Sequence, residues 1–426
     1  MRTRRFEWED PVWTAKAMRD WFAASQPQGV VESVHEIRDE IKAERDVALR
    51  RLVEKFDGVE QMPESLKVDP AEAKAALEAL DPALREAMER AAENITAVAK
   101  MQMNEGEESL ELPQGHTVTV REVPVASVGV YAPGGRAVYP SSVLMCAIPA
   151  RVAGVEHVAL ASPPDPTGRV ASPVLAAAAL CGIEEIYAMG GAHAIYALVY
   201  GTDTVTSVDV VVGPGSAWVQ EAKREAMGVV GIDSYAGPSE LMLIAGHDTD
   251  PQWAALDLCA QAEHGGESPL VVVAVEDQVL DRIATAAESA AAERPSVADA
   301  PLALVPAPDL DDAIELANAF APEHLELLEE DAILQADNVR TAGCVFVGRF
   351  GATAFGDYAA GSNHVLPTTA TGRFSGPLGP GTFRRKISKV EIGGAAAAAL
   401  APHVDLLARA EGLPVHGESA MIRSKP

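Results

Sequence analysis

The chain has 426 residues, of which 62 are acidic and 34 basic, so its formal net charge is -28. This acidity argues against nucleic acid or an anionic membrane as a partner, because both bind basic surfaces. Hydrophobic residues make up 48% of the chain and aromatic residues only 5%, so the core must consist of small aliphatic side chains. That composition suits helices packed on parallel sheets, and the length predicts about two to four domains.

The termini and the cysteines predict a cytoplasmic protein. The N-terminal basic residues are not followed by an apolar segment, so no signal peptide is expected. Every apolar stretch is too short to cross a bilayer. The four cysteines form no CxxC pair, which predicts free thiols in a reducing compartment; they are Cys146, Cys181, Cys259 and Cys344.

The first 120 residues have the periodicity of helices, chiefly over 31–56 and 70–103, with a turn or hairpin near 112–115. Strands and helices then alternate with short links, which is typical of a parallel sheet with right-handed crossovers. The predicted strands are 127–133, 157–164, 185–191 and 208–215, and the predicted helices are 141–154, 170–182, 194–201 and 216–228.

The alternation restarts after Ser239, which predicts a second α/β unit. Its predicted strands are 240–246, 269–275, 302–308 and 343–348, with a helix over 251–265. The tail after about residue 380 is Ala-rich and helical, with a possible edge strand at 386–392 and a short connection at its end.

Histidines accompany carboxylates or amides in four separate stretches of the chain. These are Gln261 with His264, Glu323 with His324, Asp357 with His364, and Glu411 with His416. Imidazole, carboxylate and amide oxygen are ligands of a catalytic divalent ion, and Glu and His also move protons near neutral pH. The four stretches therefore predict one active site assembled by folding.

The nucleotide-binding signal is weaker. The string GPGSAW (213–218) follows a predicted strand and precedes a predicted helix, but Trp218 replaces the third glycine of GxGxxG. Both a nucleotide site and a tight strand-to-helix turn remain open. The chain contains neither GxxxxGK[ST] nor HExxH, the usual signals of nucleotide hydrolysis and zinc proteolysis.

Seven strings occur in the order and spacing of the histidinol dehydrogenase family, which the chain resembles from about residue 30 to 420. They are VGVYAPGG, GPGSAWVQEAK, AGPSELMLIAG, AQAEHG, APEHLELL, FGDYAAGSNHVLPT and EGLPVH. The resemblance implies oxidation of L-histidinol to L-histidine through histidinal, with one zinc ion per subunit and two NAD. It also implies a homodimer with intertwined subunits, in which the C-terminal tail of one subunit completes the site of the other.

The resemblance assigns roles residue by residue. Glu323 and His324 would be catalytic, and the zinc ligands would be Gln261, His264, Asp357 and His416. Substrate contacts would be Ser239 and Glu411, together with the catalytic pair and the zinc ligands. Cofactor contacts would be Tyr131, His193 and Ser216. Two of these depart from the family pattern, since the family usually has Gln at position 193 and Asn at position 216.

The implied fold is α/β, with two incomplete Rossmann-like parallel-sheet domains and small helical segments at both termini. The expected parts are an N-terminal segment (1–27), a first domain (28–128 plus 239–378), a second domain (129–238) and a tail (379–426). Three other functions remain open: a related zinc- and NAD-dependent dehydrogenase of another small alcohol, a zinc hydrolase in which Glu323 activates water, and an inactive binding protein.

Overall fold

A computed structural model describes residues 1–24, 27, 29–103, 106–134, 137–235 and 237–425. The chain forms two compact units. Unit 1 contains Met1–Gln102 and Ala126–Phe383, and unit 2 contains Met103–Val125 and Arg384–Pro426. Over the residues so described, no helix combines the length and the apolar content needed to cross a membrane.

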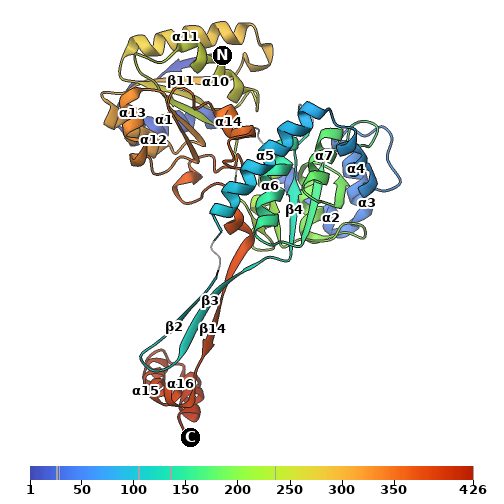
Figure 1. Ribbon diagram of the computed structural model, residues 1–426, viewed down its shortest axis with the longest axis vertical. Coiled ribbons are helices and arrows are strands. Elements are labelled where there is room, and N and C mark those ends of the chain that lie inside the picture. The colour runs from blue at the N-terminus through green and yellow to red at the C-terminus, as the bar shows by residue number, and fades with distance from the viewer. Residues whose placement is uncertain (25–26, 28, 104–105, 135–136, 236, 426) are drawn as a thin grey trace. The chain divides into compact units, whose positions relative to one another are not determined.

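The first sheet of unit 1 has six parallel strands in the order β1-β11-β10-β9-β12-β13 (Figure 1). Helices cover both faces, because alternate side chains of each apolar strand point to opposite sides. Leu241 and Leu243 pack against α10 and α11, whereas Met242 and Ile244 pack against α1 and α12. The elements are β1 (Arg2–Arg5), β9 (Leu241–Ile244), β10 (Leu270–Ala274), β11 (Pro301–Pro306), β12 (His324–Leu327), β13 (Cys344–Val347), α1 (Pro11–Ala23), α10 (Pro251–Ala262), α11 (Asp277–Ala292), α12 (Leu310–Phe320), α13 (Glu330–Leu334) and α14 (Thr353–Tyr358).

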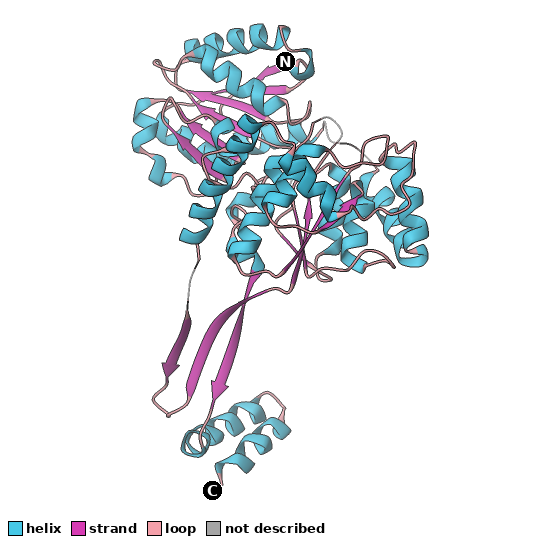
Figure 2. Ribbon diagram, turned by 45° about the vertical axis from the view of Figure 1, so that its right-hand side comes forward, coloured by secondary structure: helices cyan, strands magenta, loops and turns pink. Residues whose placement is uncertain are grey.

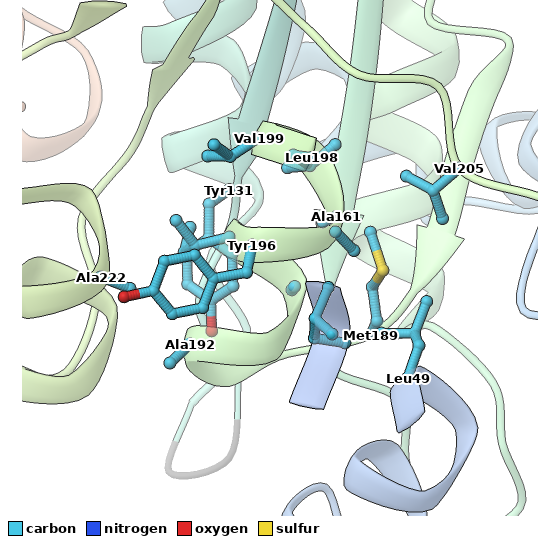
Figure 3. Packing of buried hydrophobic residues seen from close by; sticks show 14 of the residues in the cluster. Leu49, Tyr131, Ala161, Met189, Ala192, Tyr196, Leu198, Val199, Val205 and Ala222 are labelled. Atoms are coloured by element: carbon cyan, nitrogen blue, oxygen red, sulfur yellow. The ribbon is translucent and has the colours of Figure 1, made fainter. Parts of the chain in front are cut away.

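The second sheet of unit 1 has five parallel strands in the order β6-β5-β4-β7-β8. Its strands are β4 (Ser127–Tyr131), β5 (His157–Ser162), β6 (Glu185–Ala188), β7 (Val210–Val212) and β8 (Gly231–Ile232). Four helices follow these strands: α6 (Pro140–Val152), α7 (Ser172–Leu180), α8 (Gly191–Tyr200) and α9 (Ala217–Ala226). Figure 3 shows Leu198 and Val199 of α8 in the buried cluster with Tyr131 and Met189.

The N-terminal helices of unit 1 also pack around the second sheet. Helices α2 (Val30–Glu44) and α3 (Asp46–Phe56) pack against α8 and supply Ile41 and Leu49 to the same buried cluster. Helix α4 (Pro70–Glu78) packs on α7, and α5 (Pro82–Met101) packs on α6.

Unit 2 is a small antiparallel sheet with two helices (Figure 2). Its strands are β2 (Glu107–Glu111), β3 (Thr117–Pro124) and β14 (Arg384–Glu391), in the order β14-β3-β2. Helix α15 (Gly394–Ala410) packs on α16 (Pro414–Met421). The predicted hairpin turn is confirmed, since Gly115 N–H donates to Leu112 O at 2.7 Å.

The predicted α/β fold with two parallel sheets is confirmed, but several local predictions are wrong. Residues 2–5 form a strand, because the basic run pairs with the exposed edge of β11 without any apolar alternation of its own. Asp357 lies in the short helix α14, although the Gly, Ser and Asn residues around it are typical of a loop. His416 was expected in a connection and lies in α16, which begins at Pro414 and packs on α15.

A substitution at Gly213, which follows β7, tests how closely the chain packs at the end of the second sheet. Its φ is 124°, and a Cβ there would lie 2.1 Å from the carbonyl oxygen of Tyr131. We expect Gly213→Ala to destabilise the protein by about 1–3 kcal/mol through backbone strain and by about 1–3 kcal/mol more through the clash, measured by urea unfolding. Gly228→Ala is the control, since its φ is 95° with nothing within 4 Å of the added Cβ. Equal losses in the two variants would contradict the clash.

Candidate active site

A cavity of about 720 Å³ in unit 1 is lined by residues of both sheets. The second sheet contributes residues that follow β4 and β7, such as Pro133 and Gly213, at the carboxyl ends of its strands. The first sheet contributes Ser239, Glu240 and His324, at the amino ends of β9 and β12. The carboxyl ends of parallel strands are the usual ligand site of open α/β sheets, so the second sheet is the side suited to a large ligand.

Glu323 and His324 lie side by side in this cavity, and both are buried. Glu323 Oε2 accepts hydrogen bonds from Ser239 Oγ at 2.5 Å and from the backbone N–H of Glu240 at 2.7 Å. His324 Nδ1 lies 3.1 Å from the backbone oxygen of Glu240. Because a carbonyl oxygen only accepts, Nδ1 carries the proton, and Nε2 of neutral His324 is left to accept one.

The charges around His324 decide its protonation. Burial alone lowers the pKa of His324, but the negative charge of Glu323, its hydrogen bond and the charge of Asp357 together raise it to about 9. His324 Nε2 lies 3.8 Å from Asp357 Oδ1. The pair Glu323–His324 is therefore an acid–base pair held in a low-dielectric site, the arrangement that proton transfer requires.

Glu240 holds both members of this pair, and sequence reasoning did not identify it. Its side chain is fully buried and forms an ion pair with Arg19 of α1, through both carboxylate oxygens. Thr369 N–H donates to the same carboxylate at 3.1 Å. The guanidinium of Arg19 also donates to Phe320 O at 2.6 Å. An acidic residue at the head of the apolar run ELMLIAG (240–246) was the available signal, since a buried strand rarely begins with an unpaired charge.

His264 and Asp357 lie close together, and Gln261 lies three residues before His264 in the chain. Gln261 and His264 lie at the end of α10 and just beyond it, and His264 Nε2 is 3.6 Å from Asp357 Oδ2 on α14. Burial lowers the pKa of His264, but the hydrogen bond with Asp357 and the negative charges of Asp357 and Glu323 together outweigh burial and raise that pKa overall. Burial raises the pKa of Asp357, whereas His264 and His324 lower it, and the net direction is down.

One atom of this group has no partner. Gln261 Nε2 donates to Ser239 Oγ at 2.5 Å, whereas its buried Oε1 has no hydrogen-bond partner among the described residues. An amide oxygen, an imidazole and a carboxylate are donors for a divalent ion, so these three side chains fit a metal. Within the described ranges no three His, Cys, Asp or Glu side chains alone lie close enough to hold one.

His364, next to this group, also lines the cavity. Its Nδ1 donates to the backbone oxygen of Asp357 at 2.8 Å, and its Nε2 lies 3.3 Å from Ser142 Oγ. Burial lowers the pKa of His364. His364 was noted beside Asp357 in the sequence, but no role was predicted for it. Its hydrogen bond to the backbone of Asp357 holds the end of α14 in place.

The predicted cofactor residues have different surroundings. Ser216 lines the cavity at the N-cap of α9. Tyr131 ends β4, is buried and accepts a hydrogen bond from the backbone N–H of Gly191 at 3.1 Å; burial raises its pKa. His193 is 1% exposed, and its Nε2 lies 3.0 Å from Asp57 Oδ2. Gly135, the last residue of VGVYAPGG, lies outside the described residues.

A buried ion pair supports the Gly-rich turn before α9, which sequence reasoning also missed. Lys223 Nζ lies 2.5 Å from Asp233 Oδ1 and donates to Gly213 O at 2.8 Å. Asp233 Oδ2 accepts from Gly213 N–H at 2.8 Å. Both polar groups of the Gly213 backbone are thereby satisfied, and Ser216 stays at the cavity wall.

Glu411 and His416 belong to unit 2. Glu411 caps the end of α15, His416 lies in α16, and both are exposed. The remaining predicted site residues belong to unit 1, where those that line the cavity are Ser216, Ser239, His264, Glu323, His324 and Asp357.

Comparisons with known proteins agree with one another. The family model for histidinol dehydrogenase matches residues 23–424. A histidinol dehydrogenase of Nitrosomonas europaea is 40% identical over 409 residues, which is 94% of each chain. Another, of Cupriavidus pinatubonensis, is 39% identical and covers 99% of this chain and 97% of the relative. The crystal structure of histidinol dehydrogenase from Elizabethkingia anophelis has a TM-score of 0.89 at 31% identity, covering 100% of this chain and 98% of that one. As its sequence strings predicted, the chain belongs to the histidinol dehydrogenase family.

Proposed function

We propose that the protein oxidises L-histidinol to L-histidine through histidinal, with zinc and two NAD, as the last steps of histidine biosynthesis. The observation that carries this proposal is the buried Glu323–His324 pair, which faces the same cavity as His264 and Asp357. The curated relatives that match almost the whole chain are histidinol dehydrogenases, which supports histidinol as the substrate.

In this proposal the neutral form of His324 is the base of the first oxidation. A zinc ion held by Asp357 would favour that form, because it would offset one of the negative charges that raise the pKa of His324. The Nδ1–H of His324 is engaged by Glu240 O, so Nε2 takes the proton of the substrate hydroxyl group. NAD, when bound, accepts the hydride from the carbon that carries this oxygen. Tyr131, His193 and Ser216 would contact NAD, and the turn at Gly213, held by Lys223 and Asp233, would keep Ser216 in place.

Glu323 serves the second oxidation. Its Oε2 already accepts two hydrogen bonds, so we assign Oε1 to take a proton from water as the water oxygen bonds to the aldehyde carbon. At the same time His324, protonated in the first oxidation, returns its proton to the aldehyde oxygen and is neutral again. The resulting gem-diol has the same hydride to give as an alcohol. His324 would take a proton from one hydroxyl group of the gem-diol, and a second NAD would accept the hydride, which gives the carboxylic acid.

The orphaned Oε1 of Gln261 supports the metal assignment. Gln261, His264 and Asp357 would hold a zinc ion together with His416. A bound zinc supplies a positive charge that favours the deprotonated form of the substrate hydroxyl group. Ser239 and Glu411 would contact the substrate alongside these ligands and the catalytic pair.

We further propose a cytoplasmic homodimer in which His416 and Glu411 act in the partner's site. Unit 2 supports this, because its two helices expose large apolar side chains: Leu406 is 68% exposed and Val415 70%. A unit this small buries too little apolar surface by itself, so it needs another surface. The four free cysteines agree with a reducing compartment.

Absorbance at 340 nm with histidinol and NAD tests the reaction, and wild-type protein should form two NADH per histidinol.

In the same assay, Glu323→Gln is expected to slow the oxidation of supplied histidinal by about 100-fold or more, because it removes a general base. Its first hydride transfer from histidinol should fall much less. Normal consumption of histidinal by the variant would refute the role of Glu323. No NADH from histidinol, but NADH from another alcohol or hydrolysis without NADH, would favour the alternative functions.

Removal of a proposed ligand should remove the metal. We expect His264→Ala and Asp357→Ala each to weaken zinc binding at least about 100-fold and to abolish activity together with it, measured by metal analysis and chelator competition. His247→Ala is the matched control, because His247 is an exposed His 3.1 Å from the carboxylate of Asp248. Full metal content in both ligand variants would overturn the assignment.

Subunit mixing tests the shared site. Inactive His264→Ala and His416→Ala proteins, mixed in equal amounts and allowed to exchange, should recover about a quarter of wild-type activity, since half the dimers then carry one intact site of two. A mixture of His264→Ala with Asp357→Ala is the control. Both residues line the cavity of unit 1, so each subunit of a mixed dimer has a damaged cavity, and the mixture should stay inactive. No recovery after proven exchange would place His416 in its own subunit's site.

A further inference from the structure

Glu326 is a fully buried carboxyl group for which the proposed reaction has no use. It lies two residues after His324 on β12, so both side chains point to the same face of the sheet. Its neighbours in register on that face are Leu243 of β9 and Phe346 of β13, which offer no hydrogen bonds. Neither Glu326 nor its partners line the cavity, so Glu326 does not touch the substrate.

One oxygen of Glu326 binds the start of α14. Its Oε1 accepts hydrogen bonds from Thr353 N–H at 2.8 Å and from Thr353 Oγ1 at 2.6 Å. Thr353 is the first residue of α14, and the N-cap residue Ala352 makes no side-chain hydrogen bond to the helix. Glu326 therefore caps α14 from a neighbouring strand. Asp357 lies one turn further along the same helix.

The carboxyl group of Glu326 also has a partner on α10. The carboxyl group of Asp257 lies within hydrogen-bonding reach of Glu326, one turn before Gln261. Among the described residues, Oε2 of Glu326 meets no N–H or O–H donor. Two carboxylates cannot bond to each other, so the contact needs a proton on one of them. Burial raises the pKa of both groups, and the charge of Asp257 raises that of Glu326 further.

Stability alone is a poor account of this arrangement. An apolar side chain at position 326 would avoid the cost of burying a carboxyl group. What the carboxyl pair adds is a connection between three elements, each of which carries one residue of the site: Gln261 on α10, His324 on β12 and Asp357 on α14.

We propose that Glu326 and Asp257 are positioning residues, which fix α10 and α14 against β12 so that Gln261 and Asp357 stand at the spacing a metal ion requires. The inference rests on the metal site of the proposed function. The side chains act through hydrogen bonds alone, so Gln at position 326 can replace Glu: its oxygen accepts from Thr353 and its amide N–H donates to Asp257.

The test is zinc affinity at one pH, by competition with a chromophoric chelator, on full-length protein. Glu326→Leu should bind zinc about 10–100-fold more weakly than wild type, whereas Glu326→Gln should stay within about threefold. Asp257→Leu keeps the cap on α14 and should lose less affinity than Glu326→Leu. Thermal unfolding of each variant records any loss of stability.

Asn318→Leu is the matched control for general destabilisation. Buried Asn318 on α12 donates to Asn338 O at 3.0 Å and accepts from Arg340 N–H at 2.7 Å, on the opposite face of the sheet. Asn318→Leu should lower the unfolding temperature and leave zinc affinity unchanged.

Wild-type zinc affinity in folded Glu326→Leu, or equal losses of affinity in Glu326→Gln and Glu326→Leu, would overturn the proposal. If Glu326→Leu does not fold, wild-type affinity in Asp257→Leu or a large loss in Glu326→Gln overturns it. Zinc affinity is measured without substrate, so this test does not depend on the proposed reaction. If the proposed reaction is wrong, wild-type protein will bind zinc but will not oxidise histidinol.

Discussion

The buried ion pair of Arg19 and Glu240 is the contact on which the geometry of the site depends. Moving a carboxylate into the interior costs several kcal/mol, about as much as the stability of many domains, unless its oxygens are bonded. Arg19 and Thr369 N–H meet that requirement, and Glu323 N–H lies 3.3 Å from the same carboxylate. The backbone of Glu240 then donates to Glu323 and accepts from His324. Anything that shifts this one residue shifts both members of the acid–base pair.

The two sheets play different parts because they present opposite ends to the cavity. The second sheet offers the carboxyl ends of β4 and β7, where the first turn of α9 has no side-chain cap and suits a large anionic ligand. The first sheet offers the amino ends of β9 and β12, where short polar segments precede apolar strands. Reactive side chains at strand starts are held by both neighbouring strands, which makes their positions more rigid than those of loop residues.

Much of the fold was predictable from sequence, because buried parallel strands are continuous apolar runs such as LVVVA (270–274). Strand β12 was not, because EHLEL places buried polar residues at alternate positions and mimics an exposed segment. The site residues were predictable from residue chemistry and family strings. Their supports were not, since Arg19 and Glu240 are 221 positions apart and no local pattern links them. Contacts of this kind depend on tertiary structure alone.

His193 illustrates how a departure from the family pattern can be absorbed by the structure. The oxygen Oδ2 of Asp57 lies 3.0 Å from His193 Nε2 and also accepts the backbone N–H of Gly190 at 2.9 Å, and the ring of Phe56 stacks on the imidazole. A proton on His193 would thus be balanced by Asp57, so the pair would present little net positive charge to a pyrophosphate. The same aspartate fixes Gly190, and Gly191 N–H is bonded to Tyr131. An influence of His193 on NAD is therefore expected to act mainly through the shape of the turn before α8, where a Cβ on Gly190 would lie 2.6 Å from Asp57 Oδ1.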